Sequence, residues 1–205
     1  MAADDARVRP QVGADAATDD VAERRRERRC VELSIAGDGV AFREIVDRHH
    51  RGLFALCLRM LGDRAEAEDL VQETFAKSFR SLEEYDPAYR LSTWLYRIAL
   101  NTCRDHIKSP RRRERPRDAA LFAEISSTND DPRPDLDLER AERASRVRSA
   151  IDRLSDAYRE AIVLKDLQDL SYQEIRDITG HPITALKIRV VRARARLREL
   201  LEEEP

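Results

Sequence analysis

The chain of 205 residues lacks any run of about 18 apolar residues, so no segment is predicted to insert into a membrane. Its first residues, MAADDARVRP, carry acidic side chains and no apolar stretch, and therefore do not resemble a secretory signal. Together these two absences predict a cytoplasmic protein.

Cysteine, glycine and aromatic residues are also scarce. The 3 cysteines form no CxxC pair, which excludes a disulfide scaffold and fits a reducing compartment. Only 6 residues are glycine and 5% are aromatic, whereas 38% are charged, well above the roughly 25% of typical soluble proteins. This composition favours helices with wide solvated faces.

Motifs of enzymes and metal sites are missing as well. The four histidines have no carboxylate or cysteine partners at ligand spacing, and neither HExxH, a Walker A loop nor G-x-S-x-G occurs. We therefore predict no catalytic residue, no metal site and no cofactor.

The distribution of charge is uneven, although 38 Lys and Arg nearly balance 40 Asp and Glu. Basic residues concentrate at 108–117 and at 184–198, and the second block contains no acid. An acidic stretch, 118–140, separates the two blocks. Such blocks are candidate polyanion-binding surfaces because neutralised phosphates release counterions. A basic helix is also often only a solvated face, so charge alone leaves nucleic-acid binding open.

Apolar periodicity predicts an all-α protein. Residues 1–22 show no periodicity and are predicted to be a disordered tail. Helices are expected at about 23–35, 40–61 with a possible bend at Gly52, 64–81 with an Asp63 cap, and 92–108 with a Ser92 cap. Residues 82–91 are expected to be a loop.

A proline-rich stretch, 109–137, predicts a flexible linker with at most a short helix near 121–125. Beyond it, helices are expected at about 138–153, 156–167, 172–179 and 184–201. Ser155 is a plausible cap, and Ser171 with Glu174 forms a capping box. The expected architecture is therefore two small helical domains joined by a flexible linker.

The last two predicted helices are separated by a short turn that contains Gly180 and Pro182. This is the spacing of a helix-turn-helix, whose second helix enters the major groove of DNA. The helix from Thr184 has an apolar side for packing and a basic side, which together favour DNA binding.

Two sets of motifs resemble the extracytoplasmic-function group of bacterial sigma factors in the sigma-70 family. AEAEDLVQETFAKSFRSLEEYDP and LSTWLYRIALNTCRDHI resemble region 2, and LSDAYREAIVLKDLQDLSYQEI with HPITALKIRVVRARARL resembles region 4. The resemblance covers about 34–108 and 139–201. It implies region 2 at 23–108, the linker at 109–137 and region 4 at 138–205.

The resemblance also implies functional residues. DLVQE would dock on the beta prime coiled coil of core RNA polymerase through Asp69, Leu70, Gln72 and Glu73, although these acids alone could be a solvated face. The minus-10 element would be read and melted by Tyr85, Arg90, Trp94, Arg97, Asn101 and Arg104, with Tyr89 nearby and Trp94 alternatively a core residue. The minus-35 element would be read by Thr184, Lys187, Ile188, Arg189, Val191 and Arg192, with phosphate contacts from Arg194 and Arg196.

The partners implied by the resemblance are core RNA polymerase, through beta prime and the beta flap, promoter DNA and an anti-sigma factor. One departure is that the usual G-T-V-K-S-R is replaced by 184–189, TALKIR, so Ile188 can only contact a thymine methyl or pack. Two alternatives stay open. One is a sigma-like decoy that binds an anti-sigma factor or polymerase without initiating transcription. The other is an ordinary helix-turn-helix repressor, which leaves the region 2 motifs without a role.

Overall fold

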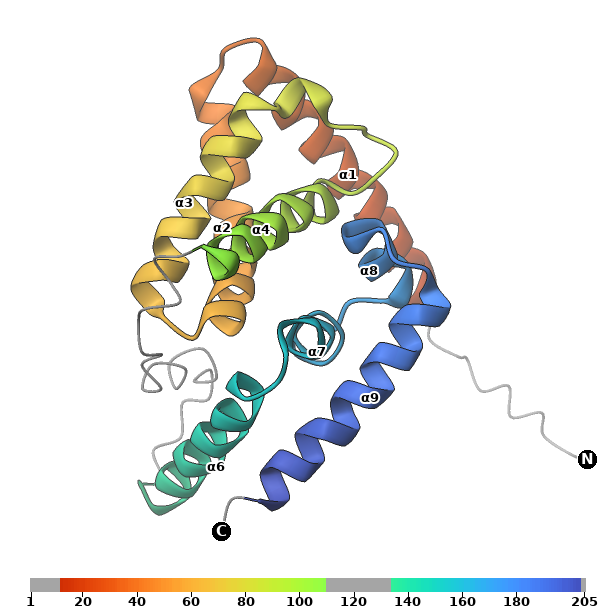
Figure 1. The fold of residues 1–205 in the computed structure, drawn as a ribbon. Coiled ribbons are helices and arrows are strands. Elements are labelled where there is room, and N and C mark those ends of the chain that lie inside the picture. The colour runs from red at the N-terminus through yellow and green to blue at the C-terminus, as the bar shows by residue number, and fades with distance from the viewer. Residues whose placement is uncertain (1–11, 110–133, 204–205) are drawn as a thin grey trace, which may run out of the picture. The chain divides into compact units, whose positions relative to one another are not determined.

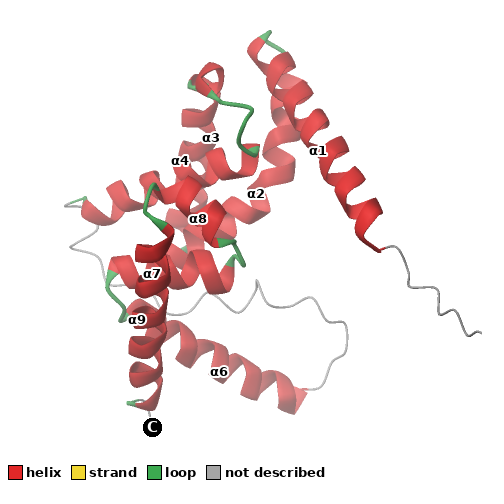
Figure 2. Ribbon diagram, turned by 90° about the vertical axis from the view of Figure 1, so that its right-hand side faces the viewer, coloured by secondary structure: helices red, strands yellow, loops and turns green. Residues whose placement is uncertain are grey.

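The computed structural model describes residues 12–109 and 134–203, and every regular element in these ranges is helical (Figures 1 and 2). The all-α prediction is therefore confirmed. In order, the elements are α1 (Val12–Ile35), α2 (Gly39–Leu61), α3 (Arg64–Arg80), the short 3-10 helix η1 (Leu82–Glu84), α4 (Leu91–Lys108), α6 (Pro134–Asp152), α7 (Asp156–Ile162), the π-helical turn η3 (Val163–Leu167), α8 (Tyr172–Thr179) and α9 (Ile183–Glu202). None of the helices in the described ranges has the length and hydropathy that a membrane span requires.

The chain divides into two compact units, Met1–Ile45 and Val46–Pro205. The first unit contains α1 and the start of α2. Helix α1 begins at Val12, so residues 12–22 lie in a helix where a disordered tail was expected. Alanine is the strongest helix former and recurs through this segment, so a helix forms without an apolar periodicity. The prediction for residues 1–11 lies outside the described residues.

In the second unit, the remainder of α2 is followed by α3 and α4, which pack on each other. As predicted, Asp63 caps α3, and its carboxylate accepts a hydrogen bond from the Glu66 backbone N–H at 2.8 Å. The predicted Ser92 cap is wrong, because α4 starts one residue earlier, with Arg90 at the N-cap position. The earlier start places Leu91, which is fully buried, in the first turn facing the core.

Gly52 does not bend α2, which runs unbroken to Leu61. It instead leaves room for α4, since a Cβ at this position would lie 2.9 Å from the hydroxyl oxygen of Tyr96. A glycine in this helix therefore marks a close approach of a side chain and not a break.

Helices α6, α7 and α9 share a second core in the same unit. The buried residues of this core are Ala150, Ile151, Leu154, Ala161, Ile162, Val190, Ala193 and Leu200. Helix α6 begins at Pro134, within the predicted linker, because proline suits the first turn of a helix. The linker prediction for 110–133, including its short helix, lies outside the described residues.

The predicted start signals of α7 and α8 differ in outcome. Ser155 occupies the N-cap position of α7, but its side chain makes no capping hydrogen bond. The capping box of α8 is confirmed: the Glu174 N–H donates to the Ser171 hydroxyl at 3.2 Å, and the Ser171 N–H donates to the Glu174 carboxylate at 2.8 Å.

Candidate nucleic-acid and polymerase interfaces

Helix α3 presents a polar face to solvent, as the DLVQE motif predicted. Asp69, Gln72 and Glu73 are exposed, whereas Leu70 is only 4% exposed and belongs to the core. Leu70 therefore supports the helix and does not contribute surface to its polar face. Glu73 forms an ion pair with Lys77 at 2.8 Å, one turn further along the helix. The exposed polar face of α3 is centred on Asp69 and Gln72, with Glu73 partly neutralised by Lys77.

A cavity of about 430 Å³ opens between the loop after η1 and the first turns of α4. Its lining residues are Glu84, Asp86, Tyr89, Thr93, Trp94 and Arg97. Trp94 lies against Tyr85, with ring centroids 5.5 Å apart and planes tilted by 56°. The Tyr85 hydroxyl in turn donates to the Tyr89 carbonyl at 2.7 Å, which fixes the loop. Aromatic faces beside a guanidinium are the groups that bind unstacked bases.

The predicted minus-10 residues occupy different positions around this cavity. Trp94 and Arg97 line it, and the ring of Tyr85 packs against that of Trp94 without belonging to the lining residues. Asn101 is exposed and lies one α4 turn beyond Arg97, outside the lining set. Sequence reasoning missed Glu84, Asp86 and Thr93, although the two carboxylates flank Tyr85 in the expected loop and could have been found there.

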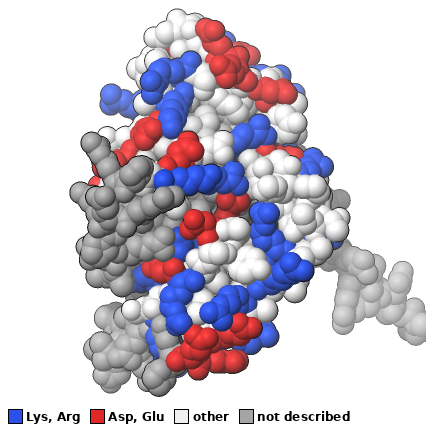
Figure 3. Space-filling model, viewed as in Figure 1, with Lys and Arg blue, Asp and Glu red and all other residues white. Residues whose placement is uncertain are grey.

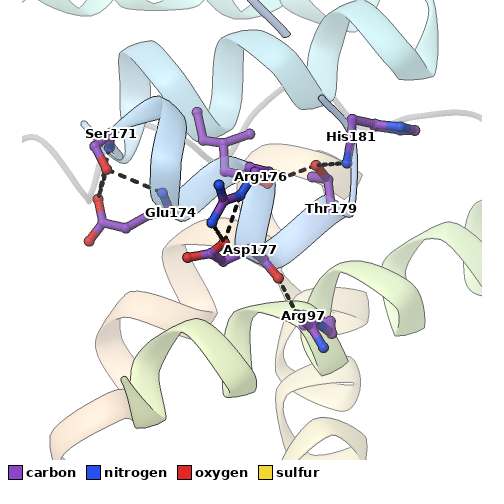
Figure 4. Close-up of polar contacts among 8 residues, drawn as sticks. Arg97, Ser171, Glu174, Arg176, Asp177, Thr179 and His181 are labelled. Atoms are coloured by element: carbon purple, nitrogen blue, oxygen red, sulfur yellow. Dashed lines mark hydrogen bonds and ion pairs between the residues drawn. The ribbon is translucent and has the colours of Figure 1, made fainter. Parts of the chain in front are cut away.

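Two arginines of α4 are bonded to helices of the C-terminal part. Arg104 forms a bidentate pair with Glu160 of α7, with Nε to Oε2 at 2.8 Å and Nη2 to Oε1 at 2.7 Å. Arg97 donates to the backbone carbonyl of Asp177 on α8 (Figure 4). The exposed side of α4 therefore also packs on α8, which no local sequence signal indicated.

Further polar contacts surround this α4 surface. The Tyr96 hydroxyl and the Gln168 side-chain amide are hydrogen-bonded at 3.2 Å, and Arg59 donates to the Leu167 carbonyl at 2.6 Å. Burial raises the pKa of Tyr96, opposed by the charge of Arg59, and burial lowers the pKa of Arg59.

The turn between α8 and α9 has the geometry that the sequence predicted. Gly180 adopts φ +74° and its N–H donates to the Arg176 carbonyl at 2.7 Å, which closes α8 with the left-handed residue that glycine tolerates best. The Thr179 hydroxyl bridges the turn: it donates to the Ile175 carbonyl at 2.7 Å and accepts from the His181 N–H at 3.3 Å (Figure 4). These bonds set the direction in which α9 leaves α8.

Helix α9 packs through buried Leu186 and Val190, so its opposite side faces solvent. Among the predicted minus-35 residues, Thr184, Lys187, Ile188, Val191 and Arg192 are exposed, and Arg189 is half-buried. Ile188 and Val191 are 50% and 64% exposed, an apolar pair flanked by cations.

The two predicted phosphate ligands, Arg194 and Arg196, form ion pairs within the chain. Arg194 binds both carboxylate oxygens of Asp166, one at 3.0 Å, and this hydrogen bonding raises the pKa of Arg194. Arg196 pairs with Glu199 at 2.8 Å and with Glu203 at 3.5 Å. Figure 3 shows basic and acidic side chains meeting at the C-terminal end of α9.

Comparison with known proteins explains this combination of surfaces. Residues 45–113 match the family model for sigma-70 region 2, and residues 144–197 match that for sigma-70 region 4. The chain belongs to the sigma-70 family, in the extracytoplasmic-function group. This sigma factor is 36% identical to the ECF RNA polymerase sigma factor SigW of Bacillus subtilis over 177 residues, which span 82% of this chain and 92% of the relative. It is 31% identical to the ECF RNA polymerase sigma-E factor of Haemophilus influenzae, over 85% of this chain and 94% of the relative.

Solved structures show the same similarity. CnrH in complex with the cytosolic domain of CnrY superimposes with a TM-score of 0.64 at 29% identity, covering 88% of this sigma factor and 99% of CnrH. The sigma factor RpoE in complex with the anti-sigma factor NepR from Bartonella quintana gives a TM-score of 0.63 at 26% identity, covering 80% and 98%. The polar face of α3 and the α4 cavity lie in the part matched to region 2, and the turn before α9 lies in the part matched to region 4.

Proposed function

We propose that this sigma factor acts in the cytoplasm as a dissociable, non-catalytic subunit that directs core RNA polymerase to promoters with two elements. The observation that carries the proposal is that one chain holds both a cavity at α4, lined by Tyr89, Trp94 and Arg97 together with the carboxylates of Glu84 and Asp86, and an exposed recognition helix, α9. We assign region 2 to residues 23–108 and region 4 to residues 138–205, joined by the segment 109–137. A lone repressor domain has no use for the first of these surfaces.

Region 2 is proposed to hold the melted minus-10 strand. A base that leaves the duplex stack needs an aromatic surface and polar groups for its edge. Trp94, supported by Tyr85, supplies the surface, and the amide of Asn101 can both donate to and accept from a base edge. Arg90, Arg97 and Arg104 would then bind the backbone phosphates.

Region 4 is proposed to place α9 in the major groove of the minus-35 element. Exposed Thr184, Lys187 and Arg192 supply the polar contacts, and Ile188 with Val191 fits thymine methyl groups, which are the apolar feature of that groove. Arg189, Arg194 and Arg196 are assigned to phosphates. The last two must first leave their ion pairs with carboxylates of the chain.

The polymerase contacts are proposed on separate surfaces. Asp69, Gln72 and Glu73 form a solvent-facing acidic strip on α3 that suits the beta prime coiled coil, and region 4 would contact the beta flap. Because the structures of CnrH and RpoE hold the cytosolic domain of CnrY and the anti-sigma factor NepR, we also propose that an anti-sigma factor controls this chain.

The test is run-off transcription with purified core RNA polymerase and a library of randomised promoters. We expect transcripts that share a two-part promoter. Asn101→Ala should weaken them at the minus-10 step, and Lys187→Ala with Arg192→Ala should weaken them at the minus-35 step, by about tenfold or more since each lost base or phosphate contact costs about 1–3 kcal/mol. Asp105→Ala and Arg198→Ala are matched exposed controls on α4 and α9, and should transcribe like the wild type.

Binding to core polymerase is measured in parallel by gel filtration. Firm binding without any transcript would reject the initiation role and favour the decoy. Transcripts unaffected by Asn101→Ala would reject the assignment of the minus-10 face.

A further inference from the structure

The α4 surface assigned to the minus-10 strand is partly covered by region 4 of the same chain. Arg97, Asn101 and Arg104 lie at positions i, i+4 and i+7 and so share one side of the helix. Two of these three side chains are bonded to region 4, Arg97 through the Asp177 carbonyl and Arg104 through Glu160. The third, Asn101, accepts from Arg104 at 3.3 Å.

The Arg104–Glu160 pair has the geometry that an arginine uses for a phosphate. Two N–H groups of one guanidinium fork bind two oxygens of one planar acid, at 2.8 and 2.7 Å. The Glu160 side chain is 9% exposed and that of Arg104 is 29% exposed. Water and salt therefore screen the attraction between these two side chains less than they screen an ion pair between fully exposed side chains. A DNA phosphate can bind Arg104 in this manner only if Glu160 is displaced.

Hydrogen bonds that involve no carboxylate hold the same interface beside this pair. Gln168, in the turn after η3, is hydrogen-bonded to the hydroxyl of Tyr96, and Arg59 of α2 donates to the neighbouring Leu167 carbonyl. Gly52 allows the approach, since any larger residue would push the Tyr96 hydroxyl from its place. Three elements of region 4, namely α7, the end of η3 and α8, thus contact α2 and α4.

We propose that region 4 is an intramolecular competitor for the minus-10 strand, in which Glu160 takes the place of a DNA phosphate on Arg104. This inference rests on the proposed role of α4 in binding the minus-10 strand. The competition is one-sided, because Thr184, Lys187, Ile188, Val191 and Arg192 on α9 stay exposed in the same arrangement. The free sigma factor therefore binds duplex through region 4 but binds single strands weakly through region 2.

Fluorescence anisotropy of the full chain with two labelled probes tests the competition. The probes are a pool of single-stranded DNA of random sequence and its duplex counterpart. Glu160→Gln removes the charge that holds Arg104 and should tighten single-strand binding about tenfold, because the charge-assisted hydrogen bonds that compete with a phosphate are weakened. Duplex binding should match that of Glu202→Gln, an exposed control with the same change in net charge.

A second variant guards against loss of folding in the first. Gln168→Ala removes the Tyr96 contact without changing a charge, and should shift single-strand binding in the same direction by a few fold. In both variants, electron–electron distance measurements between spin labels at Arg80→Cys and Arg198→Cys should show a longer and broader distribution. The three native cysteines are buried and leave these labels selective.

The outcomes separate this inference from the proposed function. If the wild type initiates transcription but both variants bind single strands like Glu202→Gln and keep the label distances, the intramolecular competition is rejected and the sigma role stands. If both variants open and bind single strands more tightly while no promoter is transcribed, the competition stands and the initiation role is rejected.

Discussion

Replacing Arg159 with methionine should unfold region 4 while region 2 remains folded. Arg159 is 1% exposed, and its guanidinium donates to the carbonyls of Asp152 at 2.7 Å, Leu154 at 3.1 Å and Ile151 at 3.3 Å. These carbonyls are at and just beyond the C-terminal end of α6, where helical N–H partners run out, although the Ile151 carbonyl also accepts from the Leu154 N–H at 3.1 Å. Arg159 therefore binds the end of α6 to α7 from inside the region 4 core.

The magnitude follows from what methionine leaves behind. A hydrogen bond to a charged group contributes about 1.5–3 kcal/mol, and each buried carbonyl without a partner costs about 1–3 kcal/mol. Methionine fills most of the volume, which limits the cavity contribution. Because the three bonds share one guanidinium and are not additive, we expect a loss of about 3–4 kcal/mol, comparable with the whole stability of a domain of this size.

The single tryptophan, Trp94, lies in region 2, so the two regions can be followed separately in the full chain. Trp94 fluorescence reports region 2, and far-UV circular dichroism reports both regions. With a urea m-value of about 1 kcal/mol/M, Arg159→Met should remove the region 4 part of the helical signal near zero denaturant. The urea midpoint of the Trp94 fluorescence transition should stay close to that of the wild type. Any shift should be no larger than the stability that region 2 gains from its contacts with region 4.

Arg153→Met is the matched control, the same chemical change at a side chain that is 45% exposed and paired with Glu203 on the surface. Surface pairs contribute about 0–1 kcal/mol, so this variant should unfold like the wild type. A dichroism transition for Arg159→Met within about 1 M of the control would refute the reasoning that the buried guanidinium holds α6 to α7.

Two further predictions concern other groups. A hydrogen bond to Cys57, together with burial, raises the pKa of the Cys103 thiol, so folding favours the protonated form. This stabilisation is complete below the unfolded pKa of about 8.5 and is lost as pH rises towards the folded pKa. Trp94-monitored urea unfolding should therefore show a stability that falls as pH rises above about 8.5, and an equal fall in Cys103→Ala would contradict the reasoning. Asp166→Asn should release Arg194 for phosphate and tighten duplex binding a few fold at low salt, with less effect at high salt. Asp169→Asn makes the same charge change where φ is +52° and asparagine is tolerated; equal binding by the two variants would show that Arg194 does not reach DNA.

Features that depend on neighbours in sequence could be predicted. Asp63 and the Ser171–Glu174 box act within one helical turn, so their capping bonds follow from residue type and spacing. Gly180 follows the same logic, because only the local backbone decides whether a left-handed residue is needed. Ser92 failed as a cap for a tertiary reason: burial of Leu91 extends α4 past the serine.

The sequence was a less consistent guide to the functional residues than to the positions of the helices. The helical periodicity of α3 puts Leu70 on the same side as Ala67 and Thr74, which are both fully buried. The periodicity alone would therefore have excluded Leu70 from a surface that docks on a partner. The sequence places Glu84 and Asp86 on either side of Tyr85, but that they line a cavity together with α4 follows only from the folded loop, since a cavity wall has no sequence period. The start of α1 at Val12 was missed because periodicity detects helices with an apolar face, and the N-terminal part of this helix lacks one while its buried residues, Cys30, Val31 and Ser34, lie near its C-terminal end.

The acids paired with Arg104 and Arg194, two arginines that we assign to DNA phosphates, show the limit of reading charge along the chain. Glu160 and Asp166 fall outside both basic blocks and outside the acidic stretch between them, and are 56 and 28 residues from Arg104 and Arg194. A charge map of the sequence therefore counts these arginines as available for phosphate. In the folded chain each is paired with a carboxylate, so a DNA phosphate would have to displace an acid to bind either arginine. Binding at these two positions exchanges one anion for another, and its salt dependence should be weaker than the number of basic residues implies.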